Sequence, residues 1–334
     1  MKAAVIPAKG ESFIIEERET PKPGPGQIRV AVEACGVCHS DAMVREGVLP
    51  GLQFPRVPGH EVAGRVDAVG EGVSRWKVGD RVGVGWHGGH CFECDDCRAG
   101  DFINCDHQQV TGATHDGGYA TAMVAPAEGA ARIPDDLDAV HAGPLLCAGV
   151  TTFNALRNAG LRAGATVAVQ GIGGLGHLGV QFARRMGCRT IAISRGDDKK
   201  QLAEELGAHD FIDAKATDPA EALQALGGAD IILATAPSGD AIQSVFGGLS
   251  KRGRLVIVAA TGEELAFPGF ALLSGKSVAG WPSGTAADSE DTMRFAVEQD
   301  VEAAIEAFPL ERAEEAYAKM MANDVRFRAV LTMS

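Results

Sequence analysis

Short runs of alternating or β-branched apolar residues dominate the first third of the chain. They cover residues 3–6, 12–17, 27–34, 61–70, 80–86 and 119–124, and Gly/Pro-rich turns such as residues 21–26 separate them. Alternation of this kind, bounded by turn residues, is typical of half-buried strands. The pattern therefore predicts a compact β-barrel with long loops up to roughly residue 124.

The pattern changes after residue 147. Apolar runs of the buried-strand type at residues 165–170, 189–194, 229–236, 254–260 and 276–281 alternate with helical-period segments at 175–187, 197–207 and 240–250. Strands that alternate with helices predict a doubly wound parallel sheet. Amphipathic helical stretches from about residue 288 precede a closing strand at 327–333, which we expect to return to the first domain. The predicted domains are thus 1–149 with 287–334, and 150–286.

Composition narrows the class of protein and its partners. A chain of 334 residues with 46% hydrophobic residues suggests two globular domains. Its net charge of −13, with no Lys/Arg-rich stripe, argues against nucleic acid or an anionic membrane as a partner and favours a small molecule. The start lacks a signal-peptide pattern, and we find no run of about 18 uninterrupted apolar residues, so we expect a cytoplasmic protein with reduced thiols.

Four cysteines lie on one short stretch, with two, two and seven residues between Cys91, Cys94, Cys97 and Cys105. This spacing is typical of a single zinc site closed by four thiolates. The bacterial iron–sulfur run starts similarly but has three residues before its last cysteine, which precedes a proline. Disulfides or unliganded thiols are the remaining alternatives. A site closed by four thiolates has no position for substrate, so its expected role is to hold the loop together.

A glycine-rich turn follows the predicted strand at 165–170. Gly171, Gly173 and Gly176, with Gly174 and Leu175 between them, form GxGxxG in the strand–turn–helix context of a dinucleotide-binding site. Gly171 would permit the tight turn, Gly173 the approach of a pyrophosphate, and Gly176 close packing of helix on sheet. Glycines that serve packing alone are the competing interpretation.

The end of the second strand of this domain bears on cofactor choice. NAD enzymes place an acid there for the ribose 2′-hydroxyl, but this chain has Ser194 and Arg195, which could bind a 2′-phosphate. We therefore predict a preference for NADP(H). Asp197 or Asp198 could still reach the ribose and allow NAD(H), although helix N-capping is their expected role.

Three further residues complete a larger pattern. Cys38 in GVCHSD, His60 in GHE and Cys147 in LCAGVT could each be an ordinary core residue. Together with the cysteine tetrad and GIGGLG, in this order along nearly the whole chain, they resemble the zinc-dependent alcohol dehydrogenases of the medium-chain dehydrogenase/reductase superfamily. The resemblance implies a GroES-like catalytic domain joined to a Rossmann domain, and two Zn²⁺ ions per chain.

The resemblance also implies roles for individual residues. Cys38, His60 and Cys147 become ligands of the catalytic zinc, and the fourth position stays open for water or an alcohol. Asp41 becomes the carboxylate that orients the zinc-bound histidine, and Glu61 an acid that approaches the metal transiently. Ser40 becomes the hydroxyl that receives the alcohol proton, although it could instead cap a helix. The relay histidine that many relatives have three residues later is Met43 here, so the proton route beyond Ser40 is open.

The remaining carried-over positions concern cofactor and substrate. His39 and Arg328 match pyrophosphate contacts, with an ordinary surface charge as the alternative for each. Leu49 and Trp86 match residues that line the substrate pocket, or they could be plain core. Glu61, in turn, could be a surface or domain-contact charge.

The resulting functional hypothesis is a zinc enzyme that transfers hydride between a primary, aromatic or secondary alcohol and NAD(P). Polyol, formaldehyde or cinnamyl-type dehydrogenases share this machinery and stay open as alternatives. A non-catalytic NADPH-binding sensor is the alternative from another class, but all three positions of the open metal site are filled. We expect a homodimer or homotetramer, with the strands at 254–260 and 276–281 as candidate pairing edges.

Overall fold

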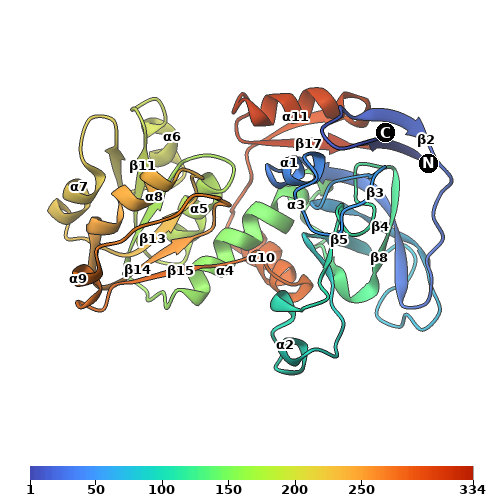
Figure 1. Cartoon of the computed structure of the whole chain (residues 1–334), viewed down its shortest axis with the longest axis horizontal. Helices are drawn as coiled ribbons and strands as arrows, with labels where there is room; N and C mark the ends of the chain where they lie inside the picture. Colours follow the sequence, from blue (N-terminus) through green and yellow to red (C-terminus); the bar gives the residue numbers. More distant parts are fainter. Residues whose placement is uncertain (334) are drawn as a thin grey trace. The chain divides into compact units, whose positions relative to one another are not determined.

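The computed structural model describes residues 1–333 and divides into two compact units. Unit 1 comprises Met1–Val150 and Ser283–Ser334, and unit 2 comprises Thr151–Pro282. In Figure 1 unit 1 runs from blue to green and resumes in red, whereas unit 2 spans the light green, yellow and orange segments between. Each unit has its own hydrophobic core.

Unit 1 is built on a mostly antiparallel sheet that, within residues 1–333, has seven strands. Along the sheet they are ordered β16 (Ile305–Pro309), β17 (Arg328–Thr332), β3 (Gln27–Gly36), β4 (Val62–Val69), β5 (Arg81–Val84) and β9 (Ala130–Arg132), and β8 (Ala122–Pro126) also pairs with β3. Two smaller pairs are β1 (Lys2–Val5) with β2 (Ile14–Glu17), and β6 (His87–Gly89) with β7 (Gln109–Val110). The expected closing strand is β17, which pairs antiparallel with β3.

Strand β3 shows why this sequence folds into a barrel. Its residues alternate between half-buried and buried positions until Ala34, after which Cys35 and Gly36 are both buried. The apolar side chains from one face enter the core with β1, β4, β5 and β8. The end of β3 therefore delivers the chain directly into the interior, where Cys38 follows.

The helices of unit 1 are short and lie mostly in its connections. They are α1 (Ser40–Arg45), α2 (Asp95–Arg98), η1 (Phe102–Asn104), η2 (Ala127–Gly129), α3 (Ala139–Pro144), η3 (Leu145–Gly149), α10 (Ala286–Glu298), η5 (Leu310–Arg312) and α11 (Ala313–Met321). Helix α10 starts with a capping box between Thr285 and Asp288, and its Glu290 accepts a hydrogen bond from the backbone N–H of Arg132. The segment after residue 282 is thereby tied to the barrel.

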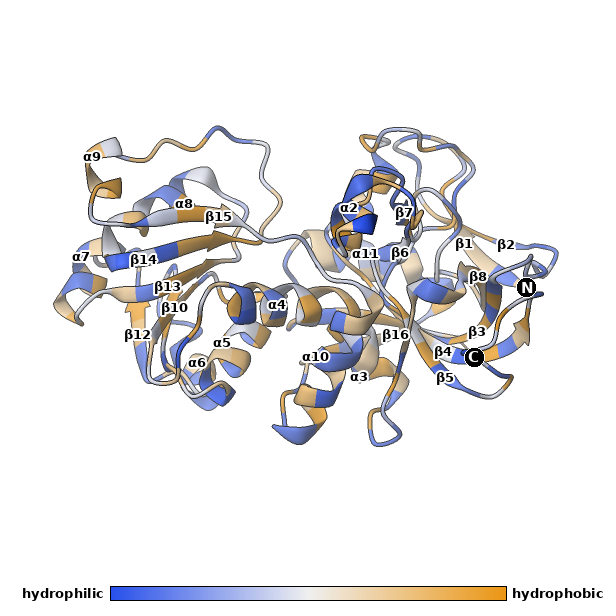
Figure 2. Ribbon diagram, turned by 90° about the horizontal axis from the view of Figure 1, so that it is seen from below, coloured by the Kyte–Doolittle hydropathy of each residue, from blue (hydrophilic) through white to orange (hydrophobic). Residues whose placement is uncertain are grey.

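Unit 2 is a parallel sheet of six strands within the described residues. The order is β12 (Asp210–Asp213), β11 (Arg189–Ser194), β10 (Thr166–Gln170), β13 (Ala229–Ala234), β14 (Leu249–Ile257) and β15 (Ser277–Gly280). Its helices are α4 (Val150–Asn158), α5 (Gly176–Arg185), α6 (Lys200–Glu205), α7 (Pro219–Ala225), α8 (Gly239–Ser244), η4 (Phe246–Gly248) and α9 (Gly269–Leu272). Figure 2 shows α5 and α6 on one face of this sheet and α8 on the other, so the central strands are apolar on both sides.

This strand order confirms the predicted Rossmann sheet and corrects two details. Numbered along the chain, the strands lie in the order 3-2-1-4-5-6, which is the dinucleotide-binding arrangement. The strand at 254–260 belongs to β14, which pairs with β13 and β15 and is therefore not an edge. Only β15, of the two predicted edges, ends the sheet. The opposite edge, β12, was not predicted, because its four residues include an aspartate at each end.

One helical run is long and apolar enough, by composition, to cross a membrane. It covers Ala139–Asn158, the consecutive elements α3, η3 and α4, with a mean hydropathy of 1.2 in its most apolar window. Of that window 78% is buried inside the protein, which is how a core helix is placed. Its apolar side chains therefore serve packing.

Candidate metal and cofactor sites

The structure brings the four loop cysteines together. The sulfur atoms of Cys91, Cys94, Cys97 and Cys105 all lie within 4.8 Å of one another. Individual Sγ–Sγ distances are 3.6 Å for Cys91–Cys105, 3.9 Å for Cys94–Cys105 and 4.0 Å for Cys91–Cys97. A tetrahedral zinc ion with Zn–S bonds of about 2.3 Å separates its sulfurs by roughly 3.8 Å. The cluster fits such an ion.

Local backbone geometry holds this cluster. Cys94 is the N-cap residue of α2, which carries Cys97, and Cys105 directly follows η1. The backbone N–H groups of Cys94 and Glu93 donate to the Cys91 sulfur at 3.3 and 3.4 Å. These donors lower the pKa of Cys91 to about 7, because they stabilise its thiolate. Burial and the neighbouring sulfurs of Cys105 and Cys94 raise the pKa of Cys97 to about 12, so within this loop the backbone donors favour the thiolate of Cys91.

A second cluster lies in the interior of unit 1. Cys38, His60, Glu61 and Cys147 each place a ligand atom within 4.8 Å of the others, and the sulfurs of Cys38 and Cys147 are 3.7 Å apart. The first residue follows β3, the next two precede β4, and the last lies in η3. The Cys147 sulfur and the His60 ring lower the pKa of Cys38 well below its usual value, which favours the thiolate that a metal requires.

The local structure around Cys147 explains how it reaches this cluster. Element η3 is a single π-helical turn, Leu145–Gly149, between the α-helices α3 and α4. A π turn holds one residue more than an α turn, and such turns occur frequently at functional sites. The preceding Pro144 has no N–H to donate to the helix, which suits a change of hydrogen-bond pattern at this point.

Asp41 organises the two loops that carry Cys38 and His60. Its Oδ1 lies 3.2 Å from Nδ1 of His60, and its Oδ2 accepts a hydrogen bond of 2.9 Å from the backbone N–H of Cys38. Both side chains are fully buried. Both ring nitrogens of His60 are buried and lack a hydrogen-bond partner within residues 1–333, and Nδ1 is the one that lies beside Asp41. A buried imidazole nitrogen without a partner, facing two cysteine sulfurs, is the donor set that zinc prefers.

Glu61 forms a buried ion pair with Arg328. The two side chains are 0% and 5% exposed, and an N–H of Arg328 donates to Oε1 of Glu61. Burial raises the pKa of Glu61 to about 7, while the charge of Arg328 opposes that rise. Neither residue is therefore the surface charge considered as an alternative.

The glycine of GVCHSD makes room for this carboxylate. A Cβ on Gly36 would lie 1.8 Å from Oε2 of Glu61, and the backbone N–H of Gly36 donates to the Glu61 carbonyl at 3.0 Å. A side chain at position 36 would displace Glu61.

The other predicted side chains lie at different depths around this cluster. Ser40 is the first residue of α1 and half-buried, whereas the N-cap is His39, which is exposed and makes no side-chain cap bond. Ser40 is thus not the helix cap considered above.

The indole of Trp86 stands edge-on to His60, with ring centroids 4.9 Å apart and planes at 90°. Leu49 is half-buried and packs against the barrel core, as expected if it is an ordinary core residue.

The glycine-rich loop of unit 2 has three distinct local requirements. Gly171 has φ of +93°, a conformation that L side chains rarely adopt. A Cβ on Gly176 would lie 1.7 Å from the Gly171 carbonyl oxygen, so this position allows close packing. A Cβ on Gly173 would meet nothing within 4 Å, which leaves open space beside the backbone. His177, buried on α5, places Nδ1 2.9 Å from the Gly173 carbonyl.

The residues after β11 form the predicted cofactor-selecting segment. Ser194 is buried at the strand end, Arg195 is exposed, and the backbone N–H of Gly196 donates to Asp213 at 2.7 Å. Sequence reasoning missed Lys199, whose Nζ donates to the carbonyl of Ile172 in the glycine-rich loop at 2.9 Å. Lys199 also occupies the N-cap position of α6, so the capping role expected for Asp197 or Asp198 is wrong. A cationic side chain shortly after the second strand of a Rossmann sheet is the signal that could have identified Lys199, because a cation there can accommodate a 2′-phosphate.

Comparison with known proteins agrees with this architecture. Residues 24–135 match the alcohol dehydrogenase GroES-like domain, and residues 174–298 match the zinc-binding dehydrogenase family. The chain is 47% identical to alcohol dehydrogenase patD of Penicillium expansum over 99% of this chain and 97% of the relative. It is 38% identical to an alcohol dehydrogenase of Geobacillus stearothermophilus, over 99% of both chains.

Three solved structures have the same fold. An NAD-dependent alcohol dehydrogenase superposes with a TM-score of 0.92 at 28% identity over 100% of both chains. A cinnamyl alcohol dehydrogenase from Sorghum bicolor gives 0.89 at 32% identity, over 99% of this chain and 97% of the other. The enzyme CAD from Helicobacter pylori, complexed with NADP(H), gives 0.88 at 26% identity, with the same coverage.

The fold, with its GroES-like and Rossmann units, and these similarities define the class. The chain belongs to the zinc-type alcohol dehydrogenases of the medium-chain dehydrogenase/reductase superfamily. It is therefore an oxidoreductase of alcohols and aldehydes rather than a non-catalytic binding protein.

Proposed function

We propose that Cys38, His60 and Cys147 hold a catalytic zinc ion, and that the cysteine tetrad holds a structural one. The observation that carries this proposal is the buried, partnerless Nε2 of His60 beside two cysteine sulfurs that are 3.7 Å apart. A zinc ion held there would draw electron density from an alcohol or carbonyl oxygen, and a nicotinamide would accept or supply the hydride. Orientation of the metal ligands and transfer of the alcohol proton would be carried out by the side chains of this protein.

Each side chain has a task that its position supports. Asp41 lies 3.2 Å from Nδ1 of His60 and would orient the ring so that Nε2 is directed at the cysteine sulfurs. Glu61 brings a fourth ligand atom within reach, and its ion pair with Arg328 is a competing partner that can hold it back. Three protein ligands would leave a coordination position for an alcohol.

Ser40 is the proposed acceptor for the alcohol proton. It is half-buried at the start of α1, two residues after Cys38, and so has access both to the ligand loop and to solvent. Since Met43 cannot carry a proton onward, release from Ser40 must go to water or to a cofactor hydroxyl.

For the cofactor, we propose NADP(H) in preference to NAD(H). Ser194, Arg195 and Lys199 supply hydroxyl and cationic groups after β11, where an NAD enzyme would place an acid. The glycine-rich loop is the proposed pyrophosphate site, and the pyrophosphate roles of His39 and Arg328 stay predictions from the family resemblance. The structural neighbours differ in this respect, since one is described as NAD-dependent and another holds NADP(H).

The cofactor proposal is tested by kcat/KM measured with both cofactors on one aldehyde. We expect the wild type to favour NADPH over NADH by at least about tenfold. Arg195→Ala should lower kcat/KM for NADPH by roughly 10-fold, because it removes a charged contact to the 2′-phosphate, and should leave that for NADH within about twofold. Arg185→Ala, an exposed arginine at the end of α5, is the matched control and should change neither. A wild type that favours NADH would overturn the preference.

For the substrate, we propose a primary or aromatic alcohol and its aldehyde. The flat indole of Trp86, fixed edge-on to His60, would narrow the approach to the ligand cluster and favour slim or planar substrates. The likeness to a cinnamyl alcohol dehydrogenase agrees with the cinnamyl-type alternative. A screen of aliphatic, polyol and aromatic alcohols, run with metal quantification, separates the candidates.

We further propose a homodimer or homotetramer in the cytoplasm. In the part of the chain that the structure describes, β15 ends the sheet of unit 2, and nearby Phe270 and Leu273 are 87% and 79% exposed. An open strand edge beside exposed apolar side chains favours pairing with a second copy. Small-angle X-ray scattering distinguishes a dimer from a tetramer.

A further inference from the structure

The Asp41 carboxylate has a third partner besides His60 and Cys38. The hydroxyl of Tyr119 donates a hydrogen bond of 2.8 Å to Oδ2 of Asp41, the same oxygen that accepts from the Cys38 N–H. A carboxylate is acceptor-only, so the phenol is the donor. Tyr119, Asp41 and His60 are all 0% exposed, so these bonds are shielded from bulk solvent.

The backbone of Tyr119 contacts the other ligand loop. Its N–H donates to the carbonyl of Pro58, two residues before His60, at 3.0 Å, and its carbonyl accepts from Ala4 of β1 at 2.8 Å. Tyr119 thus bonds to the His60 loop through its main chain and to the Cys38 loop through its hydroxyl. One residue joins two of the three segments that carry ligands of the open cluster.

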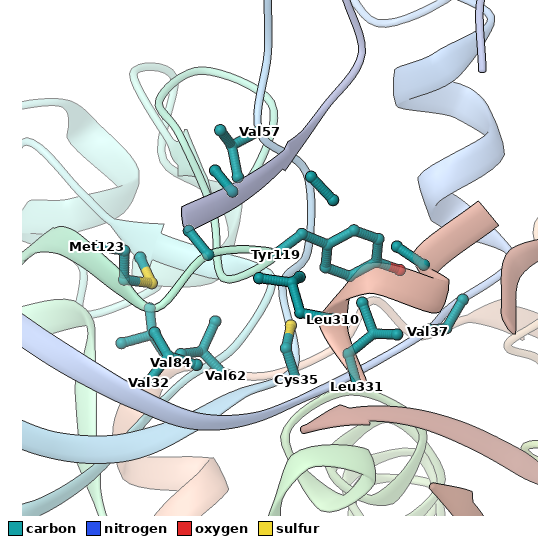
Figure 3. Close-up of a cluster of buried hydrophobic side chains, with 14 of the residues drawn as sticks. Val32, Cys35, Val37, Val57, Val62, Val84, Tyr119, Met123, Leu310 and Leu331 are labelled. Atoms are coloured by element: carbon teal, nitrogen blue, oxygen red, sulfur yellow. The ribbon is translucent and has the colours of Figure 1, made fainter. Parts of the chain in front are cut away.

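The tyrosine ring is itself held in one place. A Cβ on Gly59 would lie 2.3 Å from the ring, so the glycine before His60 is what lets the ring pack here. Phe13 contacts the ring edge-on, with centroids 5.8 Å apart. Figure 3 shows the ring inside the barrel core, with Val37 and Leu331 on the side of its hydroxyl. The hydroxyl therefore has little freedom to leave Asp41.

We propose that Tyr119 is a positioning residue for the open metal site. Its hydroxyl holds Asp41, and Asp41 in turn fixes both the His60 ring and the Cys38 main chain. Loss of a residue that orients a metal ligand typically changes metal affinity or activity by about 10- to 100-fold. Tyr119 acts through Asp41, one contact further from the metal, so we expect its loss to change metal affinity by roughly 3- to 10-fold. The inference rests on the proposed metal role of Cys38, His60 and Cys147.

The chain offers a matched pair of variants, because it contains two tyrosines. Tyr119→Phe removes one hydroxyl from the core. Tyr317→Phe removes the other from the same core, where the Tyr317 ring packs against Phe13 at 5.4 Å. Both changes keep the rings, so general packing effects are common to the two.

The test is the rate at which each of the two metals leaves the purified holoenzyme to a colorimetric chelator. We expect the first, open-site zinc to leave Tyr119→Phe roughly 3- to 10-fold faster than wild type or Tyr317→Phe, and the tetrad zinc to leave all three at one rate. Cobalt substituted at the open site should show shifted d–d absorption bands in Tyr119→Phe alone. Equal release rates and equal spectra in the two variants would overturn the inference.

The outcomes separate this inference from the proposal beneath it. If wild-type protein holds a single metal on the tetrad, the proposed function fails before Tyr119 is tested. If wild type holds two metals and Cys147→Ala loses one, while Tyr119→Phe behaves as Tyr317→Phe, only the role of Tyr119 is lost. Should Tyr119→Phe not accumulate, Phe13→Leu keeps the hydroxyl and loosens the ring, and an unchanged release rate there counts against the inference.

Discussion

The two metal-type clusters of unit 1 are built in opposite ways. The tetrad comes from 15 consecutive residues, Cys91 to Cys105, and its sulfurs accept hydrogen bonds from nearby backbone N–H groups. The open cluster comes from three segments far apart in the sequence, and His60, Glu61 and Asp41 around it are fully buried. Its side chains are held by other side chains rather than by their own loop.

The contrast shows what each kind of site needs from the fold. A closed cluster needs only a loop of correct length, since four ligands satisfy the metal without outside help. An open cluster must hold three ligands in place while the fourth position stays free, so each ligand needs its own fixed partner. We propose that Asp41, Tyr119 and Arg328 supply such support here, and all three are buried.

The largest expected effect is on the open cluster. Cys147→Ala removes one of three ligands, and we expect kcat to fall at least about a thousandfold, because polarisation of the substrate oxygen is worth several kcal/mol. Metal analysis should show one zinc per chain where the wild type has two, with the remaining ion on the tetrad. Measured kcat, with zinc content determined by mass spectrometry on the same sample, checks both statements.

The control for that experiment is another buried cysteine. Cys188 is 2% exposed and belongs to unit 2, whereas both clusters belong to unit 1, so Cys188→Ala should keep two zinc ions and nearly full turnover. An unchanged kcat in Cys147→Ala would remove Cys147 from the site altogether.

The same contrast explains what could be predicted from sequence. The tetrad and the glycine-rich loop are local, so spacing and context were enough to recognise both. Cys38, His60 and Cys147 became a set only through resemblance to a family, because no local pattern relates them. The ion pair of Glu61 with Arg328 and the bond from Tyr119 to Asp41 join residues 267 and 78 positions apart and could not be read from periodicity.

The errors in the fold have a similar cause. An apolar run indicates that a strand is buried but does not indicate which strands pair with it, so it does not distinguish an edge strand from β14, which lies between β13 and β15. β12 is short, has aspartates at both ends and lies at the edge of the sheet, where a strand needs fewer apolar side chains than a central strand does. Both cases depend on strand order, which is a property of the whole sheet.

A smaller effect is expected when the tetrad is broken. Cys94→Ser removes one ligand from the loop of residues 91–105, which the proposed structural zinc would hold together. We therefore expect loss of that zinc and a fall of about 3 kcal/mol in the free energy of unfolding. For a chain of 334 residues that corresponds to roughly 4 °C in Tm. Turnover per folded molecule should stay within about twofold. Calorimetry and kcat on the same preparation measure both.

The matched control for the tetrad is Asp95→Ala. Asp95 is an exposed residue next to Cys94 that supplies no ligand atom, and its loss should leave zinc content and Tm nearly unchanged. If Cys94→Ser instead abolished turnover while the protein stayed folded, the tetrad would have a catalytic role and the comparison of a closed with an open cluster would fail.

The smallest effect tests the packing that supports the open cluster. In Gly36→Ala the new methyl group would lie 1.8 Å from Oε2 and 2.8 Å from the carboxyl carbon of Glu61, so the carboxylate must move within a filled, buried space. We expect a loss of about 1–3 kcal/mol in the free energy of unfolding, measured by urea denaturation, with the tetrad zinc retained. Gly262→Ala is the control, because a Cβ there meets nothing within 4 Å and should change stability by less than about 0.5 kcal/mol. A Gly36→Ala protein as stable as this control would mean that Glu61 leaves its pair with Arg328 at little cost, so the filled space around the pair would not hold the carboxylate in place.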